Sequence, residues 1–396
     1  MKKIILYTAF FISLQGFSQK LLFTSEYGGD NSNGAIVSYD LSNNSTSTQL
    51  SLKGNPFYGI NIFREIPFGD TDYTAGLTLG TDGKYYGVNT NASGLRSENV
   101  FPKRRPKGLF YSYDPVTDAY EILHSFVGNQ EYNDLVVKSD AFNNDLSNPA
   151  YTVLEVNPGV FYGIALSGGV ASVGGVWKYN VNTNEYSVVG SYKDPSNDVG
   201  YQPITSLIKG DNNNIYGLNL KDSGNKEEGY LYKIDTDTDA ITYVGNLLNA
   251  GWAIVHPHGQ MVYNPSTNTI YGTKDRFTKE SSYGGGVWSF DLDTSESASE
   301  FGIFKDDIDI LGSFVAGIVR ANNGKMYATT QAGGAHGKGT IIEFQPSSSS
   351  YLKVFDFPSD FPLASGTGMI VSGSKIYGTC SPNNLSSINK MQVDLF

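Results

Sequence analysis

Residues whose chemistry could support a reaction are few in this chain. Of its four histidines, His256 and His258 flank a proline, and Arg276 follows downstream. Two imidazoles this close together could supply a general base or the ligands of a metal ion. A spacing of two residues across a proline does not force both rings to point the same way, so a role in loop packing is the competing interpretation. We treat His256, His258 and Arg276 as candidate catalytic residues.

A second feature is a basic, proline-stiffened stretch in an acidic chain. The formal net charge is −11, from 28 basic and 39 acidic residues, yet residues 101–107 read Phe-Pro-Lys-Arg-Arg-Pro-Lys. Arginine and lysine bind sulfate or carboxylate groups through charge-assisted hydrogen bonds, so an anionic ligand is one interpretation. A solvated loop that offsets the acidic surface is another, and proteolytic processing at the dibasic step is a third. The predicted ligand-binding residues are Lys103, Arg104, Arg105, Lys107, and also His336 and Lys338 of a glycine-rich segment.

Other patterns favour structure over chemistry. Asp235, Asp237 and Asp239 alternate as in a calcium-binding loop, but the glycine and the closing glutamate of an EF-hand loop are missing. A solvated turn is the favoured interpretation, and structural calcium is the alternative. The single cysteine and the histidines do not have the spacing of zinc ligands. Apart from the calcium alternative, we predict no cofactor and no metal site.

Composition and the first residues limit the class of protein. An aromatic content of 13% is typical of a folded chain, and the negative net charge argues against nucleic acid as a partner. Residues 1–19 combine Lys2 and Lys3 with the apolar run 4–14 and a polar end, which predicts a secretory signal peptide. That run is too short for a permanent membrane helix. We therefore expect a secreted or periplasmic monomer with no integral membrane segment.

A repeat organises the rest of the chain. Its first part ends in Tyr-Gly, or Tyr-Ala in one copy, and recurs at residues 85–87, 161–163, 215–217, 270–272, 326–328 and 376–378. A degenerate copy opens the mature chain at residues 22–24, with Phe23 in the place of the tyrosine. The second part alternates apolar and polar residues, as in Trp177-Lys178-Tyr179, which predicts a half-buried strand. We expect Trp177 and Trp288 to lie in the core.

Each repeat is predicted to contain four strands, A to D, because a further apolar segment precedes the tyrosine and a further strand follows a polar turn. Repeats of about 40–50 residues with four strands are typical of β-propeller blades. The copies predict one all-β domain over residues 20–396, a seven-bladed β-propeller. The first copy lacks an A strand and the last lacks a D strand. Either the terminal blades are three-stranded, or one terminal segment completes its neighbour.

The propeller prediction also places the candidate site. In a propeller the A–B and C–D turns lie on one face, and the B–C and D–A connections lie on the other. Here the turns of the first kind are short, whereas B–C segments such as 88–107 and 329–338 are long. Binding residues usually lie in loops that a rigid scaffold holds. We therefore expect the site on the long-loop face and at the mouth of the central channel.

Residues 324–344 combine a tyrosine, a Gly-Gly pair and a Gly-Thr pair before an apolar strand. The third copy is similar through residues 161–163, 168–169 and 175–177, and the second copy keeps the trailing segment Ile122–Phe126. This pattern resembles the tandem repeat of the bacterial GloVer family. The resemblance implies a secreted, propeller-like repeat protein, and that family has no established common activity.

Our leading prediction is a secreted, non-catalytic propeller that binds an extracellular ligand, an acidic polysaccharide. The first alternative is a polysaccharide lyase acting on uronate-containing glycans. Propeller lyases use His, Tyr or Arg as acid and base, and His256, His258 and Arg276 would take these roles here. The second alternative is a protein-interaction or envelope-structural propeller whose partner is an envelope protein.

Overall fold

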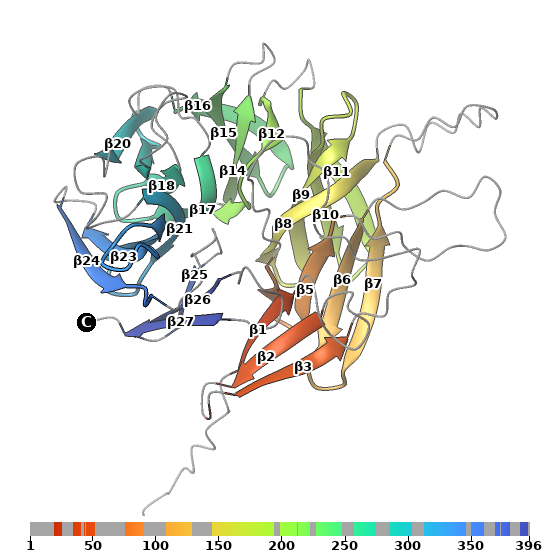
Figure 1. The fold of residues 1–396 in the computed structure, drawn as a ribbon. Coiled ribbons are helices and arrows are strands. Elements are labelled where there is room, and N and C mark those ends of the chain that lie inside the picture. Colours follow the sequence, from red (N-terminus) through yellow and green to blue (C-terminus); the bar gives the residue numbers. More distant parts are fainter. Residues whose placement is uncertain are drawn as a thin grey trace, which may run out of the picture.

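The computed structural model describes residues 20–25, 35–40, 43, 45–51, 76–90, 108–128, 145–193, 199–211, 213–221, 227–247, 257–274, 285–302, 313–345, 350–359, 369–372, 374–380 and 389–394. Every named element in these ranges is a β-strand. No helix in this part of the chain is long and apolar enough to cross a membrane. The strands form seven antiparallel sheets, which we number in chain order (Figure 1).

The first three sheets show the basic unit. The first sheet contains β1 (Lys20–Ser25), β2 (Ala35–Asp40) and β3 (Ser45–Ser51). The second contains β4 (Thr78–Leu79), β5 (Tyr85–Asn89), β6 (Leu109–Asp114) and β7 (Ala119–Ser125). The third contains β8 (Leu146–Asn157), β9 (Val160–Gly168), β10 (Gly175–Asn180) and β11 (Glu185–Ser191). Sequential strands pair as a meander, as four-stranded blades require.

The other four sheets repeat this order with one variation. The fourth contains β12 (Tyr201–Pro203), β13 (Ile208–Lys209), β14 (Asn214–Lys221), β15 (Glu227–Asp235) and β16 (Ala240–Asn246). The fifth contains β17 (Pro257–Asn264), β18 (Thr269–Lys274), β19 (Gly286–Asp291) and β20 (Glu296–Gly302). The sixth contains β21 (Ser313–Arg320), β22 (Met326–Ala332), β23 (Thr340–Gln345) and β24 (Ser350–Asp356), and the seventh β25 (Met369–Ser372), β26 (Lys375–Cys380) and β27 (Asn389–Asp394). β12 and β13 both pair with β14, so the fourth A strand is split in two.

The glycine of the repeat has a packing reason. Gly163 on β9 pairs with Trp177 on β10, and a Cβ at Gly163 would lie closer than 3.0 Å to three atoms of the indole. Gly272 and Trp288 form the same pair in the fifth sheet. In the sixth sheet Ala328 replaces the glycine, and its partner is Ile342 rather than an aromatic residue. The B-strand glycine therefore makes room for a C-strand ring.

Both faces of the inner sheets are buried, which corrects the prediction of half-buried strands. In the third sheet Trp177 and Tyr179 pack in one cluster with Phe110 of the second sheet. Tyr162 and Val176, on the opposite face, pack with residues of the fourth sheet. Because another sheet lies on each side, successive residues of a strand face one neighbouring sheet and then the other, and neither face is exposed to solvent.

The polar residues that alternate with the apolar ones on the C strands are also buried rather than exposed to solvent. Ser38, Ser112 and Ser289 are only 1%, 3% and 5% exposed. Trp177 and Trp288, at 1% and 0% exposed, are core residues as predicted. The period-two pattern therefore locates the strands correctly, but the polar side chains of the C strands lie between sheets.

The register of the first sheet corrects the alignment of the first copy. Leu22 pairs with Ser38 as Tyr162 pairs with Lys178, so Leu22 takes the place of the tyrosine. Phe23 pairs with Val37 and takes the place of the glycine. The prediction that Phe23 stands for the tyrosine is wrong by one residue. In the other sheets a small residue on the B strand pairs with a larger one on the C strand. In the first sheet the larger residue, Phe23, is on the B strand and the smaller one, Val37, is on the C strand.

Hydrogen bonds link the inner edges of different sheets. The Thr152 hydroxyl accepts the Gly76 N–H at 3.0 Å, and the Ser206 hydroxyl accepts the Thr152 N–H at 3.1 Å. The Gln260 amide brackets the backbone of Met369, accepting its N–H at 2.9 Å and donating to its carbonyl at 3.2 Å. Gln260 lies in the fifth sheet and Met369 in the seventh, so inner strands of non-adjacent sheets meet. The architecture is all-β and propeller-like; closure into one seven-bladed domain stays a prediction.

Candidate functional site

Only part of the predicted site falls on described residues. Lys103, Arg104, Arg105, Lys107, His256 and Arg276 lie outside them. His258 is described only as a backbone position of β17, where it pairs with Thr273. His336 and Lys338 lie in the connection between β22 and β23, a B–C loop of the predicted long-loop face. The described part of the predicted site is therefore the loop of residues 333–339.

This loop has a conformation that only glycine accommodates easily. Gly333, Gly334 and Gly339 have φ values of 83°, 73° and 96°, where a side chain would be strained. A Cβ at Gly339 would also lie under 3.0 Å from the Thr330 carbonyl oxygen. The Gly339 N–H donates to the Gly333 carbonyl at 2.9 Å, which closes the loop at its base. The glycines thus hold His336 and Lys338 in a defined turn.

An aspartate from the neighbouring D strand anchors the loop. Asp356 Oδ1 accepts the Ala335 N–H at 2.8 Å, and Asp356 Oδ2 pairs with the Lys353 amine at 2.7 Å. Burial by itself would raise the pKa of Asp356, but Lys353, the Ala335 N–H and the charge of His336 together lower it below the usual value. The anchoring carboxylate is therefore ionised at neutral pH, and this keeps the loop tied to β24.

The loop presents cationic groups to solvent. His336 is exposed and Lys338 is half-buried, and Lys353 stands next to the anchor. One carboxylate, Asp356, pairs with Lys353 and lies near enough to His336 for the two charges to interact. Lysine and protonated histidine donate hydrogen bonds to carboxylate and sulfate oxygens. The arrangement can therefore bind an anionic group.

The third sheet carries the same loop with different side chains. Gly168, Gly169 and Gly174 have φ values of 81°, 74° and 91°, close to those of the loop at 333–339. Ser191 replaces the anchoring aspartate, and its hydroxyl accepts the Val170 N–H at 3.1 Å. Ala171 stands where the other loop has His336. The scaffold is thus repeated, and only one of the two described copies is basic.

The comparisons agree with this repeated unit. Residues 148–389 match the Gloeobacter/Verrucomicrobia repeat, which covers both glycine loops. The chain belongs to this family. A search of curated protein sequences finds no match. The family assignment confirms the resemblance that the sequence motifs indicated.

Solved structures similar to this Gloeobacter/Verrucomicrobia repeat protein support the fold alone. A putative 6-phosphogluconolactonase from Bacteroides uniformis is 12% identical with a TM-score of 0.51, covering 95% of this chain and 96% of that one. Its counterpart from Bacteroides fragilis is 11% identical with a TM-score of 0.51, and 96% of each chain is covered. An oligogalacturonate lyase in complex with manganese is 10% identical over 81% of this chain and 72% of that one, with a TM-score of 0.44.

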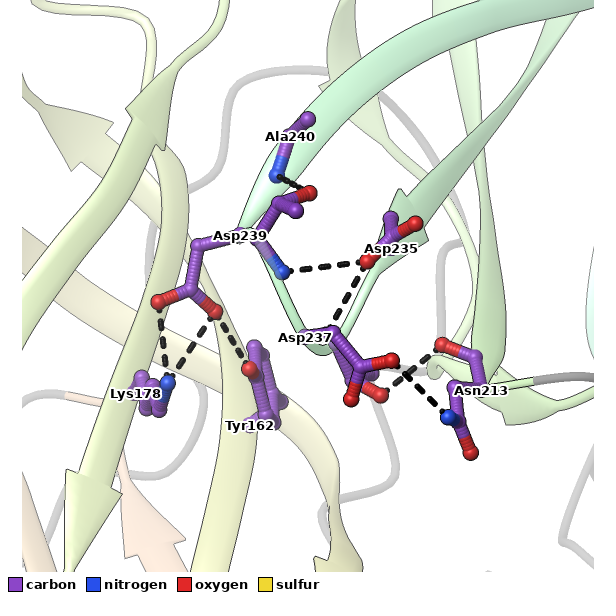
Figure 2. Close-up of polar contacts among 9 residues, drawn as sticks. Tyr162, Lys178, Asn213, Asp235, Asp237, Asp239 and Ala240 are labelled. Carbon is purple, nitrogen blue, oxygen red and sulfur yellow. Dashed lines mark hydrogen bonds and ion pairs between the residues drawn. The ribbon is translucent and has the colours of Figure 1, made fainter.

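The aspartate run of this repeat protein is a C–D turn between β15 and β16, as its favoured interpretation expected (Figure 2). Asp235 Oδ1 accepts the N–H groups of Asp237 and Thr238, both at 3.0 Å. Such contacts are typical of an aspartate at the start of a turn. In the described residues no group of three or more His, Cys, Asp or Glu side chains could hold a metal ion. These contacts use the Asp235 carboxylate to shape the turn.

Asp239 has a role that the sequence did not indicate. Its carboxylate accepts hydrogen bonds from Lys178 at 2.9 and 3.1 Å and from the Tyr162 hydroxyl, both of the third sheet. Figure 2 shows the three side chains converging across the boundary between the sheets. Burial and the bond to Asp239 raise the pKa of Tyr162. Asp239 therefore links two sheets on the short-turn face, away from the glycine loops.

His124 is the remaining described histidine, and its surroundings are those of a structural residue. Its ring stacks on Tyr186 with centroids 3.7 Å apart and an angle of 10°. The Tyr186 hydroxyl donates to Asp145 Oδ1 at 3.0 Å. Burial lowers the pKa of His124 to about 4, although Asp145 opposes this shift. The imidazole is therefore neutral at pH 7 and packs between the second and third sheets.

Sequence reasoning missed Asp356 and Ser191 as anchors of the glycine loops. Each pairs with the first residue of its C strand, Asp356 with Thr340 and Ser191 with Gly175. A polar residue at the end of the D strand, downstream of a Gly-Gly loop, is the signal that could have found them. The sequence does not show that this polar residue lies beside the glycine loop until the pairing register of the C and D strands is known.

Proposed function

We propose that this chain is an exported, seven-bladed, non-catalytic propeller that binds an acidic polysaccharide through its long-loop face. The observation that carries the proposal is the loop of residues 333–339, which Asp356 anchors at the Ala335 N–H and which contains an exposed His336 and a half-buried Lys338. Several weak contacts repeated along a polymer produce useful affinity even when each one is small. The basic stretch of residues 101–107, also in a predicted B–C loop, would add further cationic contacts.

Repeat architecture favours a polymer over a small ligand. The third and sixth sheets present glycine loops of matching backbone conformation on the same face of their sheets. A polymer chain can contact loops of several blades at once, and rigid loops lose little conformational entropy when they bind. Carboxylate or sulfate groups along the polymer match the cations of the basic loop.

Binding to a panel of purified glycans tests the proposal. We expect the protein without residues 1–19 to bind polygalacturonate, alginate or chondroitin sulfate, with an affinity that falls as salt is added. Neutral dextran serves as the uncharged control. Calorimetric titration with the double substitution His336→Ala and Lys338→Ala should show binding weakened by about three- to tenfold, as loss of exposed charge contacts implies.

A matched variant separates this site from overall charge. Lys84→Ala removes a cation from the A–B turn between β4 and β5, on the opposite face, and should leave binding unchanged. Neutralising Lys103, Arg104, Arg105 and Lys107 together should weaken it further. Equal weakening by Lys84→Ala, or no binding to any acidic glycan, would refute the proposal.

The lyase alternative has its own readout in the same experiment. Cleavage of a uronate-containing glycan by elimination forms an unsaturated product that absorbs ultraviolet light. Absorbance that grows with time and is lost in His258→Ala would replace the binding function with catalysis by His256, His258 and Arg276. Retention of an envelope protein in place of any glycan would favour the interaction propeller.

A further inference from the structure

An imidazole packs where the second and third sheets meet. His124, near the end of β7, stacks on Tyr186 of β11 with ring centroids 3.7 Å apart and an angle of 10° between the rings. Phe126 meets the imidazole edge-on, with centroids 4.8 Å apart. The Nε2 atom of His124 is buried and has no hydrogen-bond partner among the described residues. The ring is therefore held by aromatic contacts, which suit its neutral form.

A single aspartate joins this contact to the connections on either side of it. The Tyr186 hydroxyl donates to Asp145 Oδ1 at 3.0 Å, and the same oxygen accepts the Leu146 N–H at 2.8 Å. Asp145 Oδ2 accepts the Val127 N–H at 3.0 Å, just after β7 ends. The Asp145 carbonyl accepts the Gly169 N–H at 3.0 Å. One residue therefore ties together the end of the second sheet, the start of the third sheet and the glycine loop of the third sheet.

A positive charge on the imidazole would oppose this arrangement. Burial lowers the pKa of His124 to about 4, while the charge of Asp145 acts in the opposite direction. Among the described residues, Asp145 and Tyr186 are the titratable groups that act on this pKa or contact the ring. Because a histidine in an unfolded chain has a pKa of about 6.5, the packed site favours the neutral ring by about 300-fold. The stack is therefore at full strength above pH 6.5 and weakens as the pH falls toward 4.

We propose that His124, Tyr186 and Asp145 form an acid-sensitive latch that holds the glycine loop of the third sheet to the end of the second sheet. In the protonated imidazole both nitrogens are donors, and the buried Nε2 has no acceptor among the described residues. The charged ring is more stable outside the stack, in solvent or beside the Asp145 carboxylate. Either move breaks the contact with Tyr186, so the backbone bonds of Asp145 to Val127 and Gly169 open more often.

The glycine loop of the sixth sheet would not respond in this way. Its anchor is Asp356, whose pKa is lowered, so the carboxylate keeps its hydrogen bond to the Ala335 N–H as the pH falls. Acid would therefore loosen one of the two described glycine loops and leave the other in place. The latch would operate whichever ligand the long-loop face binds.

Hydrogen exchange followed by mass spectrometry tests the latch on the chain without residues 1–19. Peptides that contain Val127 or Gly169 should lose protection as the pH falls from 6.5 to 4, by up to about 300-fold after correction for intrinsic exchange. His124→Phe keeps an aromatic ring on Tyr186 but has no titratable nitrogen, so the same peptides should keep their protection. Asp145 is present in both proteins, so the difference between them reports His124.

A second variant tests the link between the stack and the aspartate. Tyr186→Phe keeps the stack but removes the hydroxyl, so protection of the peptides that contain Val127 or Gly169 should already be about tenfold lower at pH 7. Circular dichroism at pH 7 confirms that both variants fold.

Peptides of the loop at residues 333–339 are the internal control and should keep their protection in all three proteins. Equal loss of protection in this loop would indicate global unfolding and would overturn the proposal. So would unchanged protection of the latch peptides between pH 6.5 and 4, an equal loss in His124→Phe, or protection that Tyr186→Phe leaves unchanged.

Discussion

Gly163→Ala tests the conclusion that the B-strand glycine of the repeat makes room for an aromatic ring on the C strand. A Cβ at this position would approach three indole atoms of Trp177 to less than 3.0 Å. The indole cannot retreat easily, because it is 1% exposed and packs on Phe110 and Phe126, with ring centroids 5.0 and 5.4 Å away. Overpacking of a filled core costs about 1–3 kcal/mol. We expect a loss near the upper end, because neighbours hold the ring.

The sixth sheet provides the compensating change. There Ala328 faces Ile342, so Trp177→Ile should make room for the alanine at position 163. The single change Trp177→Ile leaves a cavity and costs about 3 kcal/mol by itself. Adding Gly163→Ala to it should cost less than about 0.5 kcal/mol, which corresponds to a coupling energy of about 2 kcal/mol in the double-mutant cycle.

Urea unfolding followed by far-ultraviolet circular dichroism measures all four proteins of the cycle. Ala328→Gly is the matched control, and we expect it to cost about 1–2 kcal/mol, because it removes one buried methyl group and adds backbone freedom. The reasoning is refuted if Gly163→Ala lowers the free energy of unfolding equally with tryptophan and with isoleucine at position 177.

Three further predictions follow from the polar contacts. Burial lowers the pKa of His124 from 6.5 to about 4, so the free energy of unfolding should fall by up to about 3 kcal/mol as the pH falls from 6.5 to 4. Unfolding curves of His124→Phe should lack this fall. Identical pH profiles of the two proteins would contradict the prediction. Asp239→Asn should lower the free energy of unfolding by about 1 kcal/mol, since the pair with Lys178 is partly exposed, and added salt should shrink the difference. Asp356→Ala should release the loop that carries Lys338 and raise amide hydrogen exchange there, leaving exchange in the loop at 168–174 as the unchanged internal control.

The elements of this fold could be predicted because they depend on local pattern. The Tyr-Gly motif, the alternating C strands and the short polar turns locate the strands, and the described sheets follow them. The family pattern also predicted the Gly-Gly loop, whose positive φ values require glycine wherever the chain forms it. The error at Phe23 arose where the repeat is degenerate, since Val37 on the partner strand allows a larger residue in the glycine position.

The candidate site was less predictable because it depends on residues far apart in the sequence. His336 and Lys338 stand out by residue type, but the Asp356 anchor requires the D strand to return beside the loop. Residues 101–107, His256 and Arg276 lie outside the described part of the chain, so their roles stay predictions.

The sequence by itself determined the unit: its strands, its glycine–aromatic pair and its turns, all of which rest on contacts between neighbouring strands. Tertiary structure decided which faces of the strands are buried, since Ser112 and Lys178 lie between sheets only because another sheet covers them. It also decided the links between distant residues, such as Asp239 with Tyr162 and Gln260 with Met369. Periodicity describes one sheet at a time, whereas these contacts depend on how the sheets pack against one another.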